Sequence, residues 1–359
     1  MLKKMNKTTK NNLITYAMVI LAFVIMQILI SAGSISSLLQ GLMVPLCTYI
    51  ILAVSLNLVV GILGELSLGH AGFMCVGAFT SAFFSKCTRD VIASDGLRFF
   101  LALLIGIVTA AIFGMLIGIP VLRLKGDYLA IVTLAFGEII KNMVNVLYIG
   151  KDSKGFHVTT KDVMALNMDA DGTVILNGPQ GITGTPKNST FVIGFILILL
   201  TLFIMQNLIN SRDGRAIMAI RDNRIAAESI GINITKYKLM AFTISAAMAG
   251  AAGVLYAHNI STLTANTNNF GYNMSITILV FVVLGGIGNI RGSIIAAVIL
   301  TLLPELLRGM KDYRMLIYAI VLIVMMLFNW SPKAIEWREK LNDWRKKHFS
   351  FGKKAKEVE

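Results

Sequence analysis

The sequence SRDGRAIMAIRDNRIAAESIGINITKYK, residues 211–238, is a polar segment between two apolar runs, residues 190–208 and 239–257. On a helical wheel, one face of about 120° is small or apolar and the opposite face is charged. The small face holds Ala216, Ala219, Ile220, Ala226, Ala227 and Ile230. Because glycine adopts the left-handed conformation readily, Gly231 is expected to end this helix. We therefore predict about one long helix that can approach a partner closely, against the alternative of an ordinary solvated loop helix.

The composition of the chain is that of a membrane protein. It has 56% hydrophobic and 14% charged residues, whereas a soluble domain carries about a quarter charged residues. Its net charge of +14 is concentrated in residues 1–12, 211–238 and 333–359. Bases gathered at the ends of apolar spans mark the cytoplasmic side, so the charge reports topology rather than a nucleic-acid ligand. We predict an all-α, polytopic integral membrane helix bundle.

The apolar runs predict about 8–10 transmembrane spans with both termini in the cytoplasm. The expected divisions are a cytoplasmic N-terminus (1–12), a transmembrane domain (13–330) and a basic cytoplasmic tail (331–359). Within the transmembrane domain, residues 150–189 are expected to form an external loop and residues 211–238 a cytoplasmic one. The first run, 13–30, is predicted to be an uncleaved helix rather than a signal peptide.

Two glycine-rich stretches interrupt apolar runs, GILGELSLGHAGFMCVGAF at 61–79 and GGIGNIRG at 285–292. A continuous membrane helix rarely holds so many glycines, so both are predicted to be broken or closely packed segments. Residues 54–79 and 278–303 share one pattern, an apolar run, a break and a second apolar run, which indicates a substrate path where the two meet. Two glycine-rich packing helices would show the same pattern. Residues 275–303 form either a re-entrant segment or two spans.

Motifs that would indicate an enzyme are missing from the sequence. There is no GxxxxGK[ST] phosphate-binding loop, so the chain is not expected to bind ATP itself. The histidines are scattered singly and the 3 cysteines lack CxxC spacing, so no metal site or disulfide is predicted. We expect no catalytic residues and no cofactor bound by this chain.

Four blocks, in order along the chain, carry a family resemblance. They are LNLVVGILGELSLGHAGFMCVGAF (56–79), LKGDYLAIVTLAFGEIIKNMVN (124–145), GRAIMAIRDNRIAAESIGINITKYKLMAFTISAAMAGAAGVLYAH (214–258) and LGGIGNIRGSIIAAVILTLLPELLR (284–308). Together with NGPQGITGTP at 177–186, they resemble the integral-membrane permeases of branched-chain amino-acid ABC importers, the LivM type. The resemblance implies a permease domain in the bacterial plasma membrane that translocates leucine, isoleucine and valine by alternating access.

The same resemblance implies a set of partners. These are a second homologous permease subunit, two cytoplasmic ATP-binding subunits and an extracytoplasmic solute-binding protein. ATP would act only through the partner ATPase subunits, so this chain is expected to be a transport subunit and not an enzyme.

The resemblance also assigns candidate functional residues. ABC permeases dock a short cytoplasmic helix with an EAA-like loop into the ATPase, and Ala226-Ala227-Glu228 followed by Gly231 occupies that place. The residues expected to contact the ATPase are Arg215, Arg221, Arg224, Ala226, Ala227, Glu228 and Gly231. Polar groups inside a membrane are costly and often functional. On that ground the residues expected along the translocation path are Asn57, Glu65, Ser67, His70 and Glu138.

Several alternatives stay open at this point. A permease of the same family could carry urea, short amides or other amino acids. An ion-coupled secondary transporter could use Glu65, Glu138 and His70 as a proton relay, and a membrane-embedded enzyme would rest on His70 and Glu65. Residues 128–149, which hold Glu138, form either a span that lines a wet interior or an interfacial helix. Glu65 stands where many relatives have glutamine. Three alternatives are open for its carboxylate: it lines the translocation path, it is protonated, or it extends to the membrane interface.

Overall fold

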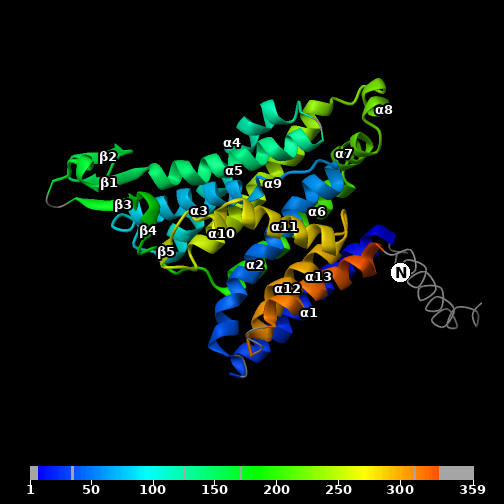
Figure 1. Ribbon diagram of the computed structural model, residues 1–359, viewed down its shortest axis with the longest axis horizontal. Helices are drawn as coiled ribbons and strands as arrows, with labels where there is room; N and C mark the ends of the chain where they lie inside the picture. The colour runs from blue at the N-terminus through cyan, green and yellow to red at the C-terminus, as the bar shows by residue number, and fades with distance from the viewer. Residues whose placement is uncertain (1–6, 34–35, 125, 170–171, 310–312, 331–359) are drawn as a thin grey trace, which may run out of the picture.

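The computed structural model describes residues 7–33, 36–124, 126–169, 172–309 and 313–330. Figure 1 shows an elongated bundle of helices with a group of strands at one end. Half of the expected cytoplasmic N-terminus, residues 1–6, and the whole basic tail, residues 331–359, lie outside the described residues.

Ten long helices make up the bundle in the described part of the chain. They are α1 (Lys7–Ser31), α2 (Ser37–Asn57), α3 (His70–Cys87), α4 (Asp95–Val121), α5 (Asp127–Val146), α6 (Phe191–Asn210), α9 (Ile234–Ala257), α11 (Tyr272–Gly285), α12 (Ile290–Leu306) and α13 (Arg314–Trp330). Eight segments of the described chain are long and apolar enough to cross a membrane, and α3 and α13 are the two long helices outside that set. The predicted polytopic helical fold and its 8–10 spans are therefore confirmed.

Shorter elements connect the long helices. The short helices are α7 (Arg212–Asp222), α8 (Arg224–Ser229) and α10 (Thr267–Phe270), with turns η1 (Leu58–Leu63), η2 (Met164–Leu166), η3 (Gly178–Gln180) and η4 (Leu307–Gly309). The strands are β1 (Tyr148–Asp152), β2 (Gly155–Thr159), β3 (Thr173–Asn177), β4 (Ile182–Thr183) and β5 (Thr262–Leu263). They form an antiparallel sheet in the order β2-β1-β3 and a separate β4-β5 pair. The polar, turn-rich stretch 150–189 thus contains regular strands.

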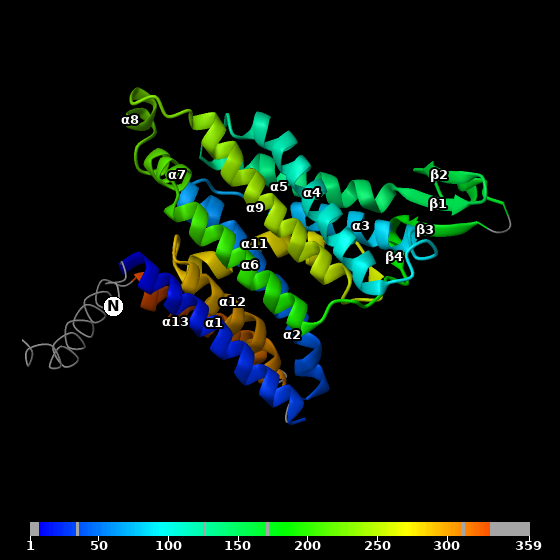
Figure 2. The same cartoon turned by 180° about the vertical axis from the view of Figure 1, so that it is seen from behind.

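Helix α9 is the centre of the bundle. It runs between α4 and α6 (Figure 2) and packs against α2, α3 and α4. A Cβ on Gly250 would lie 2.4 Å from the Cβ of Ala110, and a Cβ on Gly253 would lie 2.1 Å from the carbonyl oxygen of Met74. Backbones approach this closely only through small residues, which is how many membrane helices associate. The run of alanines and glycines in α9 therefore makes it the helix around which the others pack.

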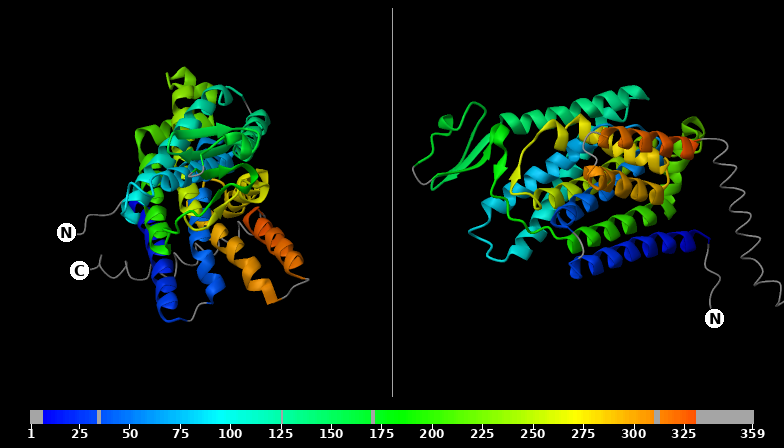
Figure 3. Two further views of the ribbon diagram at one scale, coloured as in Figure 1. Left: turned by 90° about the vertical axis from the view of Figure 1, so that its left-hand side faces the viewer. Right: turned by 60° about the horizontal axis from the view of Figure 1, so that its bottom comes forward.

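Helix α1 lies at the edge of the bundle, beside α6 (Figure 3). Only 11% of its most apolar window is buried, against 89% for that of α2. On α1, the ring of Phe23 stacks on the ring of Phe195 of α6, with the two ring centroids 3.8 Å apart. In a membrane, α1 therefore faces lipid or another subunit, whereas α2 belongs to the core.

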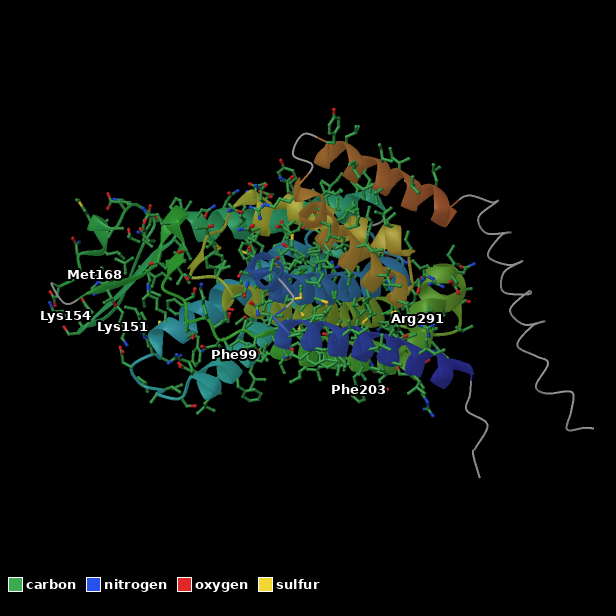
Figure 4. The ribbon with its side chains drawn as sticks, turned by 90° about the horizontal axis from the view of Figure 1, so that it is seen from below. Phe99, Lys151, Lys154, Met168, Phe203 and Arg291 are labelled. Atoms are coloured by element: carbon green, nitrogen blue, oxygen red, sulfur yellow. The ribbon has the colours of Figure 1, made fainter. Side chains whose placement is uncertain are left out.

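The bundle has two different ends. The start of α1, the α7–α8 segment and the end of α13 lie toward one end, and the strands lie at the other (Figures 1 and 3). Figure 4 shows Lys151 and Lys154 at the strand end and Arg291 toward the opposite end. We refer to these as the strand end and the α7–α8 end.

The prediction of about one long helix over residues 211–238 is wrong. Helix α7 ends at Asp222 because Asn223 adopts an extended conformation, with φ −155° and ψ 104°. The Asn223 side chain accepts a hydrogen bond from the backbone N–H of Ala226 at 3.0 Å and caps a second helix, α8. Asparagine competes with helix continuation in this way, which the helical wheel does not register. The predicted left-handed glycine after the helix is confirmed, since Gly231 has φ +86°.

The stretch 275–303 is resolved into two helices that lie side by side, α11 and α12. Gly286 and Gly288 have φ values of +93° and +80°, which only glycine adopts without strain, and they reverse the chain between the two helices. Residues 127–146 form a helix, α5, that is long and apolar enough to span. The stretch 275–303 overlaps two further segments of spanning length and composition, Thr267–Gly285 and Ile290–Gly309.

Candidate functional site

The first glycine-rich break follows α2 directly. The chain continues from Asn57 as a π-helical turn, η1, and ends it at Gly64 with φ +79°. Residues 64–69 then run without regular structure to the start of α3. A Cβ on Gly64 would lie 2.5 Å from Cγ of Arg221, so the α7 side chain packs directly on this glycine. We call residues 61–69 the first break and residues 285–289 the second break.

The two breaks lie against each other. Asn57, which is fully buried, donates from Nδ2 to Oγ of Ser293 at 2.9 Å and accepts at Oδ1 from the backbone N–H of Gly288 at 2.9 Å. A Cβ on Gly61 would lie 2.4 Å from the nitrogen of Gly288, so the two backbones touch. One predicted path residue, Asn57, therefore joins the two interrupted segments whose similar patterns the sequence showed.

The first break is also bound to the α7–α9 segment. The Arg221 guanidinium donates from Nη1 to the carbonyl oxygen of Gly61 at 3.0 Å, and it also bonds Asp222. Lys238, near the start of α9, forms an ion pair with Glu65 in which the two side chains are only 4% and 15% exposed. Arg221 and Glu65 were expected to touch an ATPase and the path, respectively, and the structure places both in this junction.

Two more polar residues, one in the first break and one just after it, are buried. Ser67 is buried, and among the described residues its Oγ has no hydrogen-bond partner. His70 begins α3, is buried, and shares a hydrogen bond of 2.7 Å between its Nε2 and Oγ of Ser55. The backbone N–H of Leu68 donates to Oγ1 of Thr133 on α5 at 3.0 Å. The break is thereby fixed to α2 and α5 as well as to α9.

Glu138 makes its contacts at the start of α11. Its Oε1 accepts from the backbone N–H of Tyr272, the first residue of α11, at 2.8 Å. Its other oxygen pairs with Lys141, whose Nζ also donates to Oγ1 of Thr267 at 3.1 Å. A carboxylate at a helix N-terminus is stabilised by the exposed N–H groups and the helix dipole. Glu138 therefore caps α11 at the end opposite the second break.

The residues expected to contact an ATPase divide into two groups. Ala227 is buried against Ile220 and Ile234, and Arg215 bonds the carbonyl oxygen of Asn210 at 3.1 Å. Arg224 is partly exposed, while Ala226, Glu228 and Gly231 are exposed. The α8 surface also presents two apolar side chains, Ile225 at 81% and Ile230 at 76% exposure. Ile230, which was predicted on the small face that approaches a partner, directly follows α8 and leaves its side chain exposed.

Sequence reasoning missed several partners of the site. Lys238 was read only as a topology charge, although a lysine next to the apolar run of α9 could have suggested a buried counter-ion for Glu65. Thr133 and Ser275 gave no signal, yet each bonds the backbone at one side of the first break, at Leu68 and Ala71. Among the described residues, no cluster of three His, Cys, Asp or Glu side chains could hold a metal ion.

Comparison with known proteins gives a consistent family. A family model described as branched-chain amino acid transport system, permease component, matches residues 37–328. The permease protein LivM of the high-affinity branched-chain amino acid transport system of Salmonella typhimurium is 35% identical, over 91% of this chain and 75% of its own length. The LivM protein of Escherichia coli is 33% identical over the same shares, and E. coli LivH is 25% identical over 70% of this chain and 79% of LivH. No solved structure matches the chain significantly.

Proposed function

The chain belongs to the family of permease components of branched-chain amino acid transport systems, and on that premise we propose that it is the membrane subunit of an ABC importer for leucine, isoleucine and valine. It lies in the bacterial plasma membrane as a multi-pass protein, with the α7–α8 end and both termini in the cytoplasm. The clusters of basic residues at 1–12, 211–238 and 333–359 support this orientation. A permease of the same family for other small solutes is the nearest alternative.

One observation carries the proposal, the connection between the α7–α8 end and the two breaks. Arg221 binds the carbonyl oxygen of Gly61, and Lys238 pairs with Glu65. Asn57 then joins the first break to Gly288 and Ser293 in the second. A force applied to α7 and α8 is thus passed through polar contacts to the two segments where the membrane helices are interrupted. Interrupted helices are where transporters of several folds bind and gate their substrates.

In this mechanism the energy comes from outside the chain. Two cytoplasmic ATP-binding subunits engage α8 through its exposed Ile225, Glu228 and Ile230. Their closure on ATP moves α7, and Arg221 and Lys238 carry the movement to the first break. A second permease subunit completes the membrane unit, and the similarity to LivH supports a paired arrangement. An extracytoplasmic solute-binding protein delivers the amino acid at the strand end.

The placement of the three relay candidates speaks against an ion-coupled transporter. Glu65 pairs with Lys238, Glu138 caps α11, and His70 bonds Ser55. Among the described residues, none of the three candidates hydrogen-bonds another, whereas a proton relay needs a connected chain of such groups.

Reconstitution with candidate ATPase partners tests the proposed function. Leucine uptake into proteoliposomes is measured for the wild type and for Glu228→Arg, with an imposed proton or sodium gradient as the second arm. We expect uptake that requires ATP and that the charge reversal on exposed α8 abolishes while the protein stays folded. Uptake that follows an ion gradient without any ATPase contradicts the ABC assignment.

A further inference from the structure

A polar cavity of about 510 Å³ opens at the strand end, far from both breaks. It lies between the end of α3, the start of α4 and the loop that carries Gly184, Thr185 and Pro186. That loop is the last part of the motif NGPQGITGTP, to which the transport mechanism assigns no role. Phe99, which follows Arg98 on α4, lies nearer the strands than Arg291 does (Figure 4).

The cavity carries an excess of positive charge. Lys86, Arg89 and Arg98 line it together with a single acid, Asp95. Nζ of Lys86 also donates to the carbonyl oxygens of Val174 and Ile175 on β3, at 2.9 Å and 3.4 Å, which fixes this cation beside the cavity. Arg98 is 4% exposed, and its guanidinium pairs with Asp95 and donates from Nη1 to the carbonyl oxygen of Ile92 at 3.1 Å. These two contacts hold the guanidinium in one place at the wall of the cavity. Three bases against one acid in a partly enclosed space form an electrostatic site for an anion.

Two residues that line this cavity each carry a buried donor without an acceptor in the described part of the chain. Nε of Arg98 and Oγ of Ser85 are both buried, and neither has a hydrogen-bond partner among the described residues. Ser85 itself is fully buried. Buried donors are almost always paired in folded proteins, and an unpaired one costs free energy, so two in one cavity indicate that a ligand supplies the acceptors.

The surroundings of the cavity place it at the surface of the membrane. Beyond Arg98, α4 is a helix of spanning length, and Leu97, Phe100 and Leu104 expose their side chains along its outer face. Val91, in the loop before α4, is also exposed. A phosphate held in the cavity would therefore have an apolar helix face beside it, suited to acyl chains. Guanidinium groups bind phosphate through paired, charge-assisted hydrogen bonds.

We propose that this cavity binds a phosphate group at the membrane surface, with Arg98 and Ser85 as the inner donors and Lys86 and Arg89 as the outer cations. The phosphate is that of a phospholipid head group or of a free phosphate ion. The site lies at the strand end and is independent of the junction between the breaks.

The test uses the full chain, purified in a non-ionic detergent and stripped of lipid. Isothermal titration calorimetry compares dihexanoyl-phosphatidylglycerol, dihexanoylglycerol with the same chains and no phosphate, and inorganic phosphate. The variants are Arg89→Gln at the exposed rim and Ser85→Ala, whose hydroxyl contributes no hydrogen bond to the fold. Lys187→Gln is the matched control, since it removes an exposed base beside Pro186 that does not line the cavity. Thermal unfolding verifies that each variant is folded.

We expect the phosphatidylglycerol to bind saturably and dihexanoylglycerol not to bind. Arg89→Gln and Ser85→Ala should each weaken binding about tenfold, as expected for the loss of one charge-assisted or buried hydrogen bond, while Lys187→Gln leaves it unchanged. Inorganic phosphate that binds as tightly as the lipid, with the same sensitivity to the variants, identifies the free ion as the ligand. If neither phosphate source binds, or if Lys187→Gln weakens binding as much as Arg89→Gln and Ser85→Ala leaves it unchanged, the proposal is wrong.

Discussion

The two breaks differ in what holds them. The first is bound from several sides, by Arg221 of α7, by Lys238 of α9 and by Thr133 of α5. The second is bound to the first through Asn57 and packs on Gly61, and just after it Arg291 donates from Nε to Oγ1 of Thr15 on α1 at 2.6 Å. The first break is thus a junction that joins α7 and α9 to the second break.

This difference assigns the two breaks different roles. A junction with charged contacts on one side and a close backbone contact on the other can pass a displacement from α7 to α12. The second break, a turn built on two glycines with positive φ, can respond to that displacement by a change in its backbone. Each variant below removes one part of this chain of contacts, from the largest expected effect to the smallest.

The buried ion pair should show the largest effect. Lys238→Met leaves the Glu65 carboxylate buried without its partner, and the loss of one member of a buried pair costs about 3–5 kcal/mol. The double variant Glu65→Gln with Lys238→Met removes both charges and should recover most of that stability. Thermal unfolding of the purified chain, arranged as a double-mutant cycle, measures the coupling. A double variant no more stable than Lys238→Met would show that the pair does not hold the first break.

The backbone contact between the breaks comes next. In Gly61→Ala the new Cβ would lie 2.0 Å from Oδ1 of Asn57 and 2.4 Å from the nitrogen of Gly288, so the breaks must separate. Overpacking of this kind costs about 1–3 kcal/mol. Gly41→Ala is the matched control, because nothing lies within 4 Å of its new Cβ. We expect lower stability and lower ATP-dependent uptake for Gly61→Ala alone. If Gly61→Ala and Gly41→Ala had the same stability and the same uptake, transport would not depend on the backbone contact between the breaks.

Arg221→Gln should affect transport more than stability. It removes a hydrogen bond to the Gly61 carbonyl from a partly exposed side chain, which is worth only about 1 kcal/mol. Because that bond joins α7 to the first break, ATP hydrolysis by the partner subunits should continue while leucine uptake falls. Arg212→Gln, on the exposed start of α7, serves as the control. The ratio of uptake to ATP hydrolysed is the measurement, and an unchanged ratio in Arg221→Gln contradicts the role of the contact.

The smallest effect is expected at the strand end. Burial alone would raise the pKa of Asp152, but the N–H groups of Asp169, Lys154 and Gly155 and the ring of His157 donate to its carboxylate and hold the pKa below its usual range. At pH values above about 3.9, the pKa of an aspartate in the unfolded chain, the carboxylate therefore stabilises the strands. That stabilisation is lost as the pH falls through the lower pKa of Asp152 in the folded protein.

Asp152→Asn tests this at a distance from the breaks. At neutral pH the variant should exchange its β1 and β2 amide hydrogens faster than the wild type, and the difference should vanish at the lowest pH, where Asp152 is protonated. This difference is measured by amide hydrogen exchange at each pH, corrected for the intrinsic exchange rates. Amide exchange in α7 and α9 should match that of the wild type, since the strand end is not part of the junction. Faster exchange in α7 or α9 of the variant would mean that the junction is not confined to the breaks.

The sequence was sufficient to locate the breaks but not to join them. Glycines clustered at 61–79 and 285–292 are a compositional signal, because a membrane helix does not tolerate them without a packing reason. The contact from Asn57 to Ser293 spans 236 positions along the chain, and the pair of Glu65 and Lys238 spans 173. Such contacts depend on how whole helices pack, which no local periodicity records.

Local chemistry explains the one helix that was predicted wrongly. The wheel over residues 211–238 treated Asn223 as a polar residue on a small face, whereas asparagine is a strong helix N-cap and its side chain starts α8. The position of Glu138 beside the N-terminus of α11 could not be seen from the sequence of α5 alone, because it depends on how the two helices pack.

The central claim, that α7 moves the second break through the first, is tested most directly by a distance. Spin labels are attached at Ile287 in the second break and at Ile139 of α5, both of which are exposed. The chain that carries them has Cys47, Cys75 and Cys87 replaced by alanine, and pulsed electron paramagnetic resonance measures the distance between the two labels. The measurement compares the assembled complex with and without ATP. We predict a distance change on ATP binding that disappears when Arg221→Gln is combined with Glu65→Gln and Lys238→Met. An equal change in that variant, with the partner subunits still bound, would contradict the account.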